Sequence, residues 1–258
     1  MLAMWLLITI TMVIFIGISF SKDISLGSYT LTKARFPETL LANNDKTPGP
    51  LDSIEETPDT VAMIEEEVIE PDTTVHKLLI FGDSMTHNLA MSIGKYGTRN
   101  NYKVIGVAWE SSSTLRWAKS GKIREYIETY KPDYIIISLG SNEMDLKNFE
   151  LRAPYVSDIV KQLGDIPYVW VGPPLWKEDK GLYPMILQGV PKDKFFRTGN
   201  FDMERGPDHI HPTRRGADAW ADTIMKWIAK SPHPILTEKP DSGTTTRGHK
   251  FIYLHPED

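Results

Sequence analysis

The sequence predicts an α/β domain built on a parallel sheet with helices on both faces. Four short runs have the apolar character of strands that are covered on both sides. These runs are Lys77–Phe81, Tyr102–Val107, Tyr134–Leu139 and Tyr168–Val171. Amphipathic stretches alternate with them, and a repeated strand–helix order implies parallel strands joined by right-handed crossovers.

Between the strands we expect helices at Asn88–Tyr96, Leu115–Tyr130 and Pro154–Leu163. A last helix is predicted from Thr213 to Ala229, because apolar residues recur there every three or four positions and form a stripe. Prolines follow that helix and end it. Residues 77–232 are therefore expected to form one domain, and their length is sufficient for one core.

The first 20 of the 258 residues include no Asp, Glu, Lys, Arg or His. As a helix they would span about 30 Å, the thickness of a bilayer core. We therefore expect residues 1–21 to be an uncleaved signal anchor that holds the domain outside the cytoplasmic membrane, in the periplasm or at the cell surface. A cleaved signal peptide, and hence a secreted protein, is the alternative, since Ser19 and Ser21 could frame a cleavage site.

Residues 22–76 have the composition of an acidic, proline-containing linker. Between Asp52 and Asp72 lie nine acidic residues and no Lys or Arg, which predicts an extended or disordered stretch or, alternatively, an acidic docking tail. Subtracting these nine charges from the net charge of −5 leaves about +4, too little to indicate a nucleic-acid partner. Residues 233–258 are predicted to be a C-terminal tail, either loose or forming an edge strand.

A Gly-Asp-Ser motif directly follows the first predicted strand. Ser84 ends the run Phe81-Gly82-Asp83-Ser84, between an apolar strand and a helical pattern. Such a turn would expose the serine hydroxyl, and the following helix N-terminus would stabilise negative charge beside it. An ordinary turn or helix cap can have the same three residues.

Two further motifs complement this serine. Asn142, in Gly140-Ser141-Asn142-Glu143, could direct its amide N–H at a developing oxyanion, or could belong to a plain turn.

In Asp208-His209-Ile210-His211, an aspartate three residues before a histidine can reach its Nδ1 and leave Nε2 free to face the serine. His211 is therefore the expected base, oriented by Asp208. A metal site made of Asp208, His209 and His211, with His87, is the alternative, but no ligand spacing typical of metal sites supports it, and we expect no metal.

With these motifs the sequence resembles the SGNH hydrolases, the GDSL-type esterases and lipases. It matches the family's Gly-Asp-Ser block at Gly82–Ser84, its Gly-x-Asn block at Gly140–Asn142 and its Asp-x-x-His block at Asp208–His211. The resemblance covers residues 77–230. It implies a three-layer, flavodoxin-like sheet with the strand order 2-1-3-4-5.

The sequence departs from the family pattern at two places. Glu143 stands where the family usually has Asp, a mild change in a supporting position. The family's remaining block has a loop glycine, and aligning Ser111-Ser112-Ser113-Thr114 with it puts Ser112 at that glycine. The expected oxyanion donors are therefore the backbone N–H groups of Ser84 and Ser112 and the Asn142 amide.

These features predict a carboxylic ester hydrolase that works through an acyl-enzyme and needs no cofactor. Family analogy and location suggest an acylated polysaccharide or cell-envelope glycan as its substrate. Trp176 and Trp109 are candidates for a sugar-stacking wall, although at least two of Trp109, Trp117, Trp170 and Trp176 are expected to be buried. A lipolytic or thioester hydrolase, a catalytically idle glycan-binding module and an acetyl-transferring enzyme are the alternatives. The other expected partner is the membrane, through the N-terminal helix.

Overall fold

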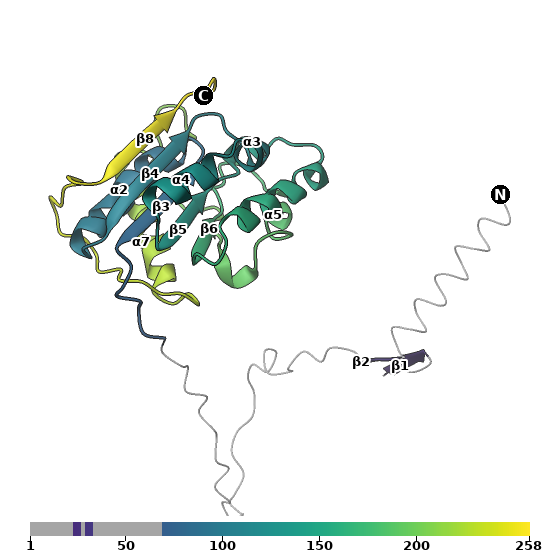
Figure 1. The fold of residues 1–258 in the computed structure, drawn as a ribbon. Coiled ribbons are helices and arrows are strands. Elements are labelled where there is room, and N and C mark those ends of the chain that lie inside the picture. Colours follow the sequence, from purple (N-terminus) through teal and green to yellow (C-terminus); the bar gives the residue numbers. More distant parts are fainter. Residues whose placement is uncertain (1–22, 27–28, 33–68) are drawn as a thin grey trace, which may run out of the picture. The chain divides into compact units, whose positions relative to one another are not determined.

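The structure is a computed structural model that describes residues 23–26, 29–32 and 69–258 (Figure 1). The strands β1 (Asp23–Leu26) and β2 (Tyr29–Thr32) form an antiparallel hairpin. This hairpin belongs to a unit separate from Ile64–Asp258. The expected anchor, residues 1–21, and most of the expected linker lie outside the described residues. Within the described ranges, none of the helices is long and apolar enough to cross a membrane.

In the second unit, six parallel strands form one sheet with the order β7-β6-β5-β3-β4-β8. The strands are β3 (Lys77–Gly82), β4 (Lys103–Trp109), β5 (Tyr134–Ser138), β6 (Tyr168–Val171), β7 (Phe195–Phe196) and β8 (Lys250–Leu254). The predicted parallel α/β sheet is therefore confirmed.

Counted from β3, the first five strands follow the order 2-1-3-4-5 that the family resemblance implies. The difference is β8, which adds a sixth strand beside β4 and is missing from the predicted order. Its register places Phe251 beside Gly106 and Leu254 beside Trp109. Residues 233–258 therefore contribute an edge strand to the sheet.

The helices that cover the sheet are α2 (Thr86–Arg99), α3 (Thr114–Lys119), α4 (Lys122–Tyr130), α5 (Ala153–Gln162), α6 (Leu182–Ile186) and α7 (Arg214–Ile228). The prediction of a single helix from Leu115 to Tyr130 is wrong, because α3 and α4 are separate. Gly121 lies between them with φ of 75°, and a left-handed residue cannot continue a right-handed helix. Short 3₁₀ turns occur at Ser141–Glu143 (η2), Phe149–Leu151 (η3) and Lys192–Lys194 (η4).

Alternate residues of β3 divide the core into two layers. Leu79 and Phe81 belong to a cluster that includes residues of α3, α4, α5 and α6. Leu78 and Ile80 belong to a second cluster, to which α2 and α7 contribute. All four side chains are fully buried, so β3 is the centre of the fold, with one helical layer on each face.

The chain enters this unit at the amino ends of the central strands. Asp72 N–H donates to Pro234 O at 2.7 Å, and Val75 is buried. The N–H groups of His76 and Lys77 both donate to Asp133 Oδ2, at 2.9 and 2.8 Å, directly before β5. The last residues of the predicted linker are thus packed against the sheet.

Candidate active site

Ser84 lies in the turn between β3 and α2. Thr86 N–H donates to Asp83 O at 3.0 Å and His87 N–H donates to Ser84 O at 3.2 Å, which closes the turn into the helix. Ser84 is partly exposed at the carboxyl end of β3. In open parallel α/β sheets, ligands bind beyond this end of the strands.

The approach of β3 to β5 fixes the backbone just before Ser84. A Cβ atom on Gly82 would lie only 1.7 Å from Ser138 O, so no side chain fits there. The Thr86 hydroxyl donates to the same carbonyl at 3.0 Å. The start of α2, which directly follows β3 in the chain, is thus also bonded to the end of β5.

Asp83 connects the Gly-Asp-Ser motif to the Gly-Ser-Asn motif. Its carboxylate is fully buried and accepts the N–H groups of Met85 at 3.1 Å, Gly140 at 3.0 Å and Ser141 at 2.9 Å. Burial raises the pKa of Asp83, and these hydrogen bonds oppose the rise. The carboxylate therefore joins the ends of β3 and β5 at the site.

A tight turn before α7 presents Asp208 and His211. Gly206 N–H donates to His211 O at 2.8 Å, and His209 takes the left-handed conformation with φ of 58°. Asp208 Oδ1 accepts the N–H groups of Ile210 at 3.0 Å and His211 at 3.1 Å. These bonds hold the Asp208 carboxylate next to His211, the residue that it is expected to orient.

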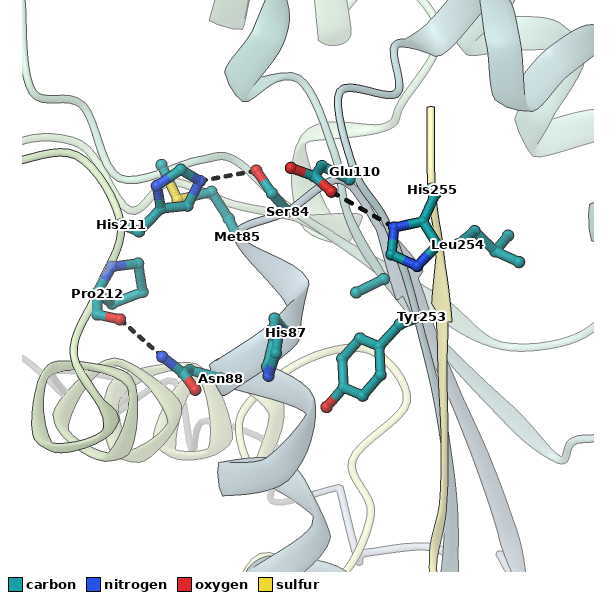
Figure 2. A pocket seen from close by; sticks show the side chains of 11 residues that line it. Ser84, Met85, His87, Asn88, Glu110, His211, Pro212, Tyr253, Leu254 and His255 are labelled. Atoms are coloured by element: carbon teal, nitrogen blue, oxygen red, sulfur yellow. Dashed lines mark hydrogen bonds and ion pairs between the residues drawn. The ribbon is translucent and has the colours of Figure 1, made fainter. Parts of the chain in front are cut away.

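The three predicted residues form one hydrogen-bonded series. Asp208 Oδ2 lies 2.6 Å from His211 Nδ1. His211 Nε2 lies 2.8 Å from Ser84 Oγ, and Figure 2 shows this second contact. A carboxylate can only accept, so Nδ1 carries the proton and Nε2 is left to accept from the serine hydroxyl. The hydrogen bond to His211 lowers the pKa of Asp208 to about 2, which keeps the carboxylate ionised at neutral pH.

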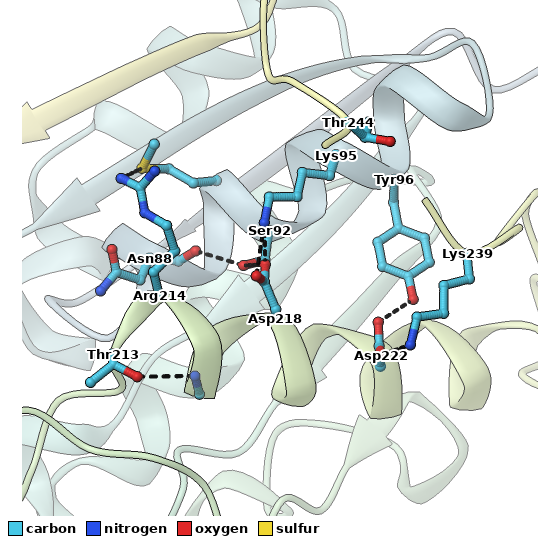
Figure 3. A network of polar contacts seen from close by, with 12 residues as sticks. Asn88, Ser92, Lys95, Tyr96, Thr213, Arg214, Asp218, Asp222, Lys239 and Thr244 are labelled. Atoms are coloured by element: carbon cyan, nitrogen blue, oxygen red, sulfur yellow. Dashed lines mark hydrogen bonds and ion pairs between the residues drawn. The ribbon is translucent and has the colours of Figure 1, made fainter. Parts of the chain in front are cut away.

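Polar contacts between α2 and α7 align the two turns (Figure 3). On α2, Ser92 Oγ and Lys95 Nζ both lie 2.7 Å from Asp218 Oδ1 of α7. One turn further, Tyr96 OH donates to Asp222 Oδ1 at 2.7 Å. Because Ser84 precedes α2 and His211 precedes α7, these contacts fix the relative position of the serine and the histidine.

The structure brings Asn142 and Ser112 together. Asn142 Nδ2 donates to Ser112 O at 2.9 Å, from η2 to the loop after β4. Ser112 is fully buried, and its N–H donates to Trp109 O at 3.2 Å. The N–H expected to bind an oxyanion is therefore used within its own turn. The oxyanion roles of Asn142 and Ser112 stay predictions.

The left-handed residue of this loop is Ser111, with φ of 55°, one position before the residue aligned with the family glycine. Glycine adopts this conformation more easily than serine does. Glu143 supports the same loop: it is buried and accepts the Thr114 hydroxyl and the Thr114 N–H, the latter at 3.1 Å to Oε1. Burial raises the pKa of Glu143, and the bonds from Thr114 oppose the rise.

A pocket of about 560 Å³ opens beside Ser84 and His211 (Figure 2). It is lined by Ser84, Met85, His87, Asn88, Ala108, Glu110, His211, Pro212, Tyr253, Leu254 and His255. An edge strand was one of the two alternatives predicted for residues 233–258, but neither β8 nor Glu110 was predicted to contribute to the site. An apolar run at Phe251–Leu254 was visible in the sequence, but nothing there indicated that it would pair with β4.

Neither Trp176 nor Trp109 lines this pocket. Trp109 is only 2% exposed, and its indole N–H donates to His255 O at 2.8 Å. Trp117 and Trp170 are also buried, which agrees with the expectation that at least two of the four tryptophans would be. The sugar-stacking role of Trp176 and Trp109 stays a prediction.

Among the residues that the structure describes, no group of three or more His, Cys, Asp or Glu side chains is arranged to hold a metal ion. The residues of the alternative metal site are disposed differently. His211 is hydrogen-bonded to Asp208 and Ser84, and His87 packs against Tyr253 with 4.2 Å between ring centroids.

Comparisons with known proteins give structural neighbours only: no family model and no curated protein matches the sequence. The psychrotrophic esterase EstA from Pseudoalteromonas sp., solved with monoethylphosphonate as inhibitor, is similar over 60% of this chain and 97% of its own, with 16% identity and a TM-score of 0.46. A lipolytic protein of the G-D-S-L family from Veillonella parvula is similar over 58% and 97%, with 12% identity and a TM-score of 0.41. TubZ of the Clostridium botulinum phage c-st is similar over 60% of each chain, with 10% identity and a TM-score of 0.38.

Proposed function

We propose that this protein is a serine esterase of the SGNH type that removes O-acetyl groups from a polysaccharide or cell-envelope glycan. The observation that carries the proposal is the hydrogen-bonded series from Asp208 through His211 to Ser84, beside an open pocket. A hydroxyl, a base and a group that orients the base are the set that acyl transfer to serine requires.

In the proposed mechanism, His211 Nε2 accepts the Ser84 proton while Ser84 Oγ attacks the ester carbonyl carbon. The Asp208 carboxylate stabilises the imidazolium that forms. The bond to the leaving alcohol breaks as His211 returns the proton to the alcohol oxygen, leaving an acyl-enzyme. His211 then deprotonates a water molecule, which attacks the acyl carbon. The bond between this carbon and Ser84 Oγ breaks as His211 returns the proton to Oγ, which releases acetate and restores the Ser84 hydroxyl.

The oxyanion would be stabilised by the N-terminus of α2, by the backbone N–H of Ser84 and by the Asn142 amide. The Ser112 N–H could join them only if it left Trp109 O. Replacing Asn142 with Ala should lower kcat by about 10²–10³-fold with little change in KM, as for other single oxyanion donors. A decrease in kcat of less than about threefold would contradict this role for Asn142.

The first test is turnover of p-nitrophenyl acetate by the purified full-length protein. The proposal predicts turnover that disappears in Ser84→Ala and is unchanged in Ser242→Ala, a substitution at an exposed serine on the loop after α7. Circular dichroism and thermal unfolding would show that the variants are folded. Folded wild-type protein that hydrolyses neither this ester nor an acetylated sugar would contradict the proposal.

A catalytically idle glycan-binding module is the second candidate, favoured by the hydrogen bond between Ser112 N–H and Trp109 O. Such a module would bind acetylated glycan equally well with Ser84→Ala and would show no turnover. A lipolytic enzyme is a further alternative, since Met85, Ala108, Pro212 and Leu254 make part of the pocket apolar. Esters of longer acyl chains would then be better substrates than acetates.

In this proposal, residues 1–21 attach the enzyme to the membrane and leave the domain outside the cytoplasm. Fractionation of cells that express the full-length protein tests the attachment. Protein that stays in the membrane fraction after an alkaline carbonate wash would support it, whereas protein in the soluble fraction would contradict it. Release of soluble protein into the medium would support the cleaved, secreted form.

A further inference from the structure

We propose that the end of β8 forms the subsite for the alcohol part of the substrate, with Tyr253 as a platform for a neutral sugar ring and Glu110 as an acceptor for its hydroxyls. The inference rests on the proposed esterase function and names what the pocket recognises. The first five strands of the sheet do not supply this wall. It comes from the sixth strand, β8, and from the loop after β4.

The end of β8 is held firmly at the edge of the pocket. Because β8 runs parallel to β4, its carboxyl end reaches the same side of the sheet as Ser84. Glu110 N–H donates to Leu254 O at 2.9 Å, and the Trp109 indole donates to His255 O at 2.8 Å. These bonds continue the attachment of β8 past the last residue of the strand.

Tyr253 presents an aromatic ring to the pocket. It is 44% exposed, unusual for a large apolar side chain in this domain, and it lines the pocket together with Ser84. His87 packs against it with 4.2 Å between ring centroids (Figure 2). Burial and the nearby Arg214 lower the pKa of His87, which favours a neutral imidazole beside the tyrosine. Sugar rings present C–H groups that pack well on such an aromatic face.

Glu110 and His255 supply the polar part of the same wall. Glu110 Oε2 lies 3.8 Å from His255 Nδ1, and both side chains are exposed (Figure 2). A carboxylate accepts hydrogen bonds from hydroxyl groups, which a sugar has in excess. Neither Lys nor Arg is among the lining residues, and Arg214 lies behind the lining, so an anionic substrate would meet the Glu110 charge directly. The pocket chemistry therefore favours a neutral polyhydroxylated group.

The pocket volume of about 560 Å³ is within the ordinary range for small-molecule sites. Ser84 and His211 form one side, and Tyr253 and Glu110 contribute the β8 side (Figure 2). One substrate could therefore have its ester at Ser84 while its sugar ring lies against Tyr253.

The test compares two neutral acetyl esters, a 6-O-acetylated methyl glucoside and ethyl acetate, whose alcohol has neither a ring nor free hydroxyls. Tyr253→Ala should lower kcat/KM for the acetylated sugar about tenfold more than for ethyl acetate, chiefly through KM. Tyr253→Phe retains the ring and should retain most of the preference. Tyr155→Ala, on α5 and outside the pocket, is the matched control and should leave the ratio of the two activities unchanged.

Glu110→Gln provides a second test that does not depend on the tyrosine. It should weaken the preference for the acetylated glucoside. It should also raise kcat/KM for a 4-O-acetylated methyl glucuronide, whose C6 carboxylate is anionic, relative to the 4-O-acetylated methyl glucoside. If folded Tyr253→Ala and Glu110→Gln leave these ratios unchanged while both esters are hydrolysed, the subsite is wrong and the esterase stands. If wild-type protein hydrolyses p-nitrophenyl acetate but not the acetylated glucoside, the subsite is likewise wrong. If it hydrolyses none of these esters, the esterase itself is wrong.

Discussion

Asn88 of α2 donates a hydrogen bond of 2.9 Å to the carbonyl oxygen of Pro212 (Figure 2). Asn88 lies about one helical turn after Ser84, and Pro212 directly follows His211. This bond therefore joins the backbone beside the proposed base to the helix that begins beside the proposed nucleophile. Among the contacts between α2 and the turn before α7, this one lies nearest in sequence to Ser84 and His211.

Replacing Asn88 with Ala should lower kcat for p-nitrophenyl acetate by about five- to tenfold, because loss of one hydrogen bond lets the His211 turn shift relative to Ser84. KM should change little. Asn148→Ala, in an exposed loop after β5, is the control. Unchanged kcat in folded Asn88→Ala would show that the α2–α7 contacts deeper in the structure are sufficient to position His211.

Replacing Asp208 with Asn should lower kcat by about 10³–10⁴-fold, with KM nearly unchanged. An amide can donate its N–H to His211 Nδ1, which would place the ring proton on Nε2, where it blocks acceptance of the Ser84 proton. Steady-state kinetics with Asp202→Asn as the control would measure the effect. If Asp208→Asn retained more than about a tenth of the wild-type kcat, Asp208 would not be the orienting group.

Gly82→Ala should destabilise the domain by about 3 kcal/mol or more, because the new Cβ would collide with the Ser138 carbonyl in the centre of the sheet. Gly164→Ala is the matched control, since Gly164 has φ of 62° and a Cβ atom added there would meet no heavy atom within 4 Å. That substitution should cost only about 1–2 kcal/mol of backbone strain. Urea unfolding would distinguish the two, and equal losses would contradict the steric explanation.

His249 should make the stability of the domain sensitive to mild acid. Its Nδ1 accepts Val104 N–H at 3.0 Å and must therefore be unprotonated, and its Nε2 lies 3.0 Å from the Thr98 hydroxyl. Burial, together with the charge of Lys103, lowers the pKa of His249 from its ordinary value of 6.5. The folded protein thus favours the neutral ring, and this contribution to stability is complete above pH 6.5 and is lost as pH falls through the lowered pKa.

The free energy of unfolding should therefore fall more steeply in the wild type than in His249→Gln as the pH decreases below about 6.5. His233→Gln removes an exposed histidine and should keep the wild-type slope. Identical slopes for wild type and His249→Gln would contradict the prediction. Because His249 directly precedes β8, hydrogen exchange of the β8 amides should show the same dependence on pH.

The sequence predicted the four central strands and the grouping of Ser84, Asp208 and His211 because those signals are local. Each central strand is a continuous apolar run, and Asp208 and His211 are three residues apart in one turn. The parallel order then brings separate strand ends to one edge of the sheet. The strand–helix alternation was therefore sufficient to predict that Ser84, Asp208 and His211 lie together.

The part of the pocket formed by β8 and Glu110 depends on contacts between segments that are distant in the sequence. The run Phe251–Leu254 is short and only partly buried, and its place beside β4 is set by the edge that the other strands leave open. Tyr253 and Glu110 therefore meet without any spacing that a sequence could display. The loop conformation at Ser111 was missed for a different reason, because serine gives no local sign of a left-handed backbone.

The contacts of Asp72 and Val75 lie at the amino end of β3, whereas the pocket lies at its carboxyl end. A strand of this length separates the two ends by about 20 Å. Residues 69–72 therefore join the domain at the end of the sheet opposite the pocket. A ligand that enters the pocket approaches from the far side of the domain and does not meet these residues.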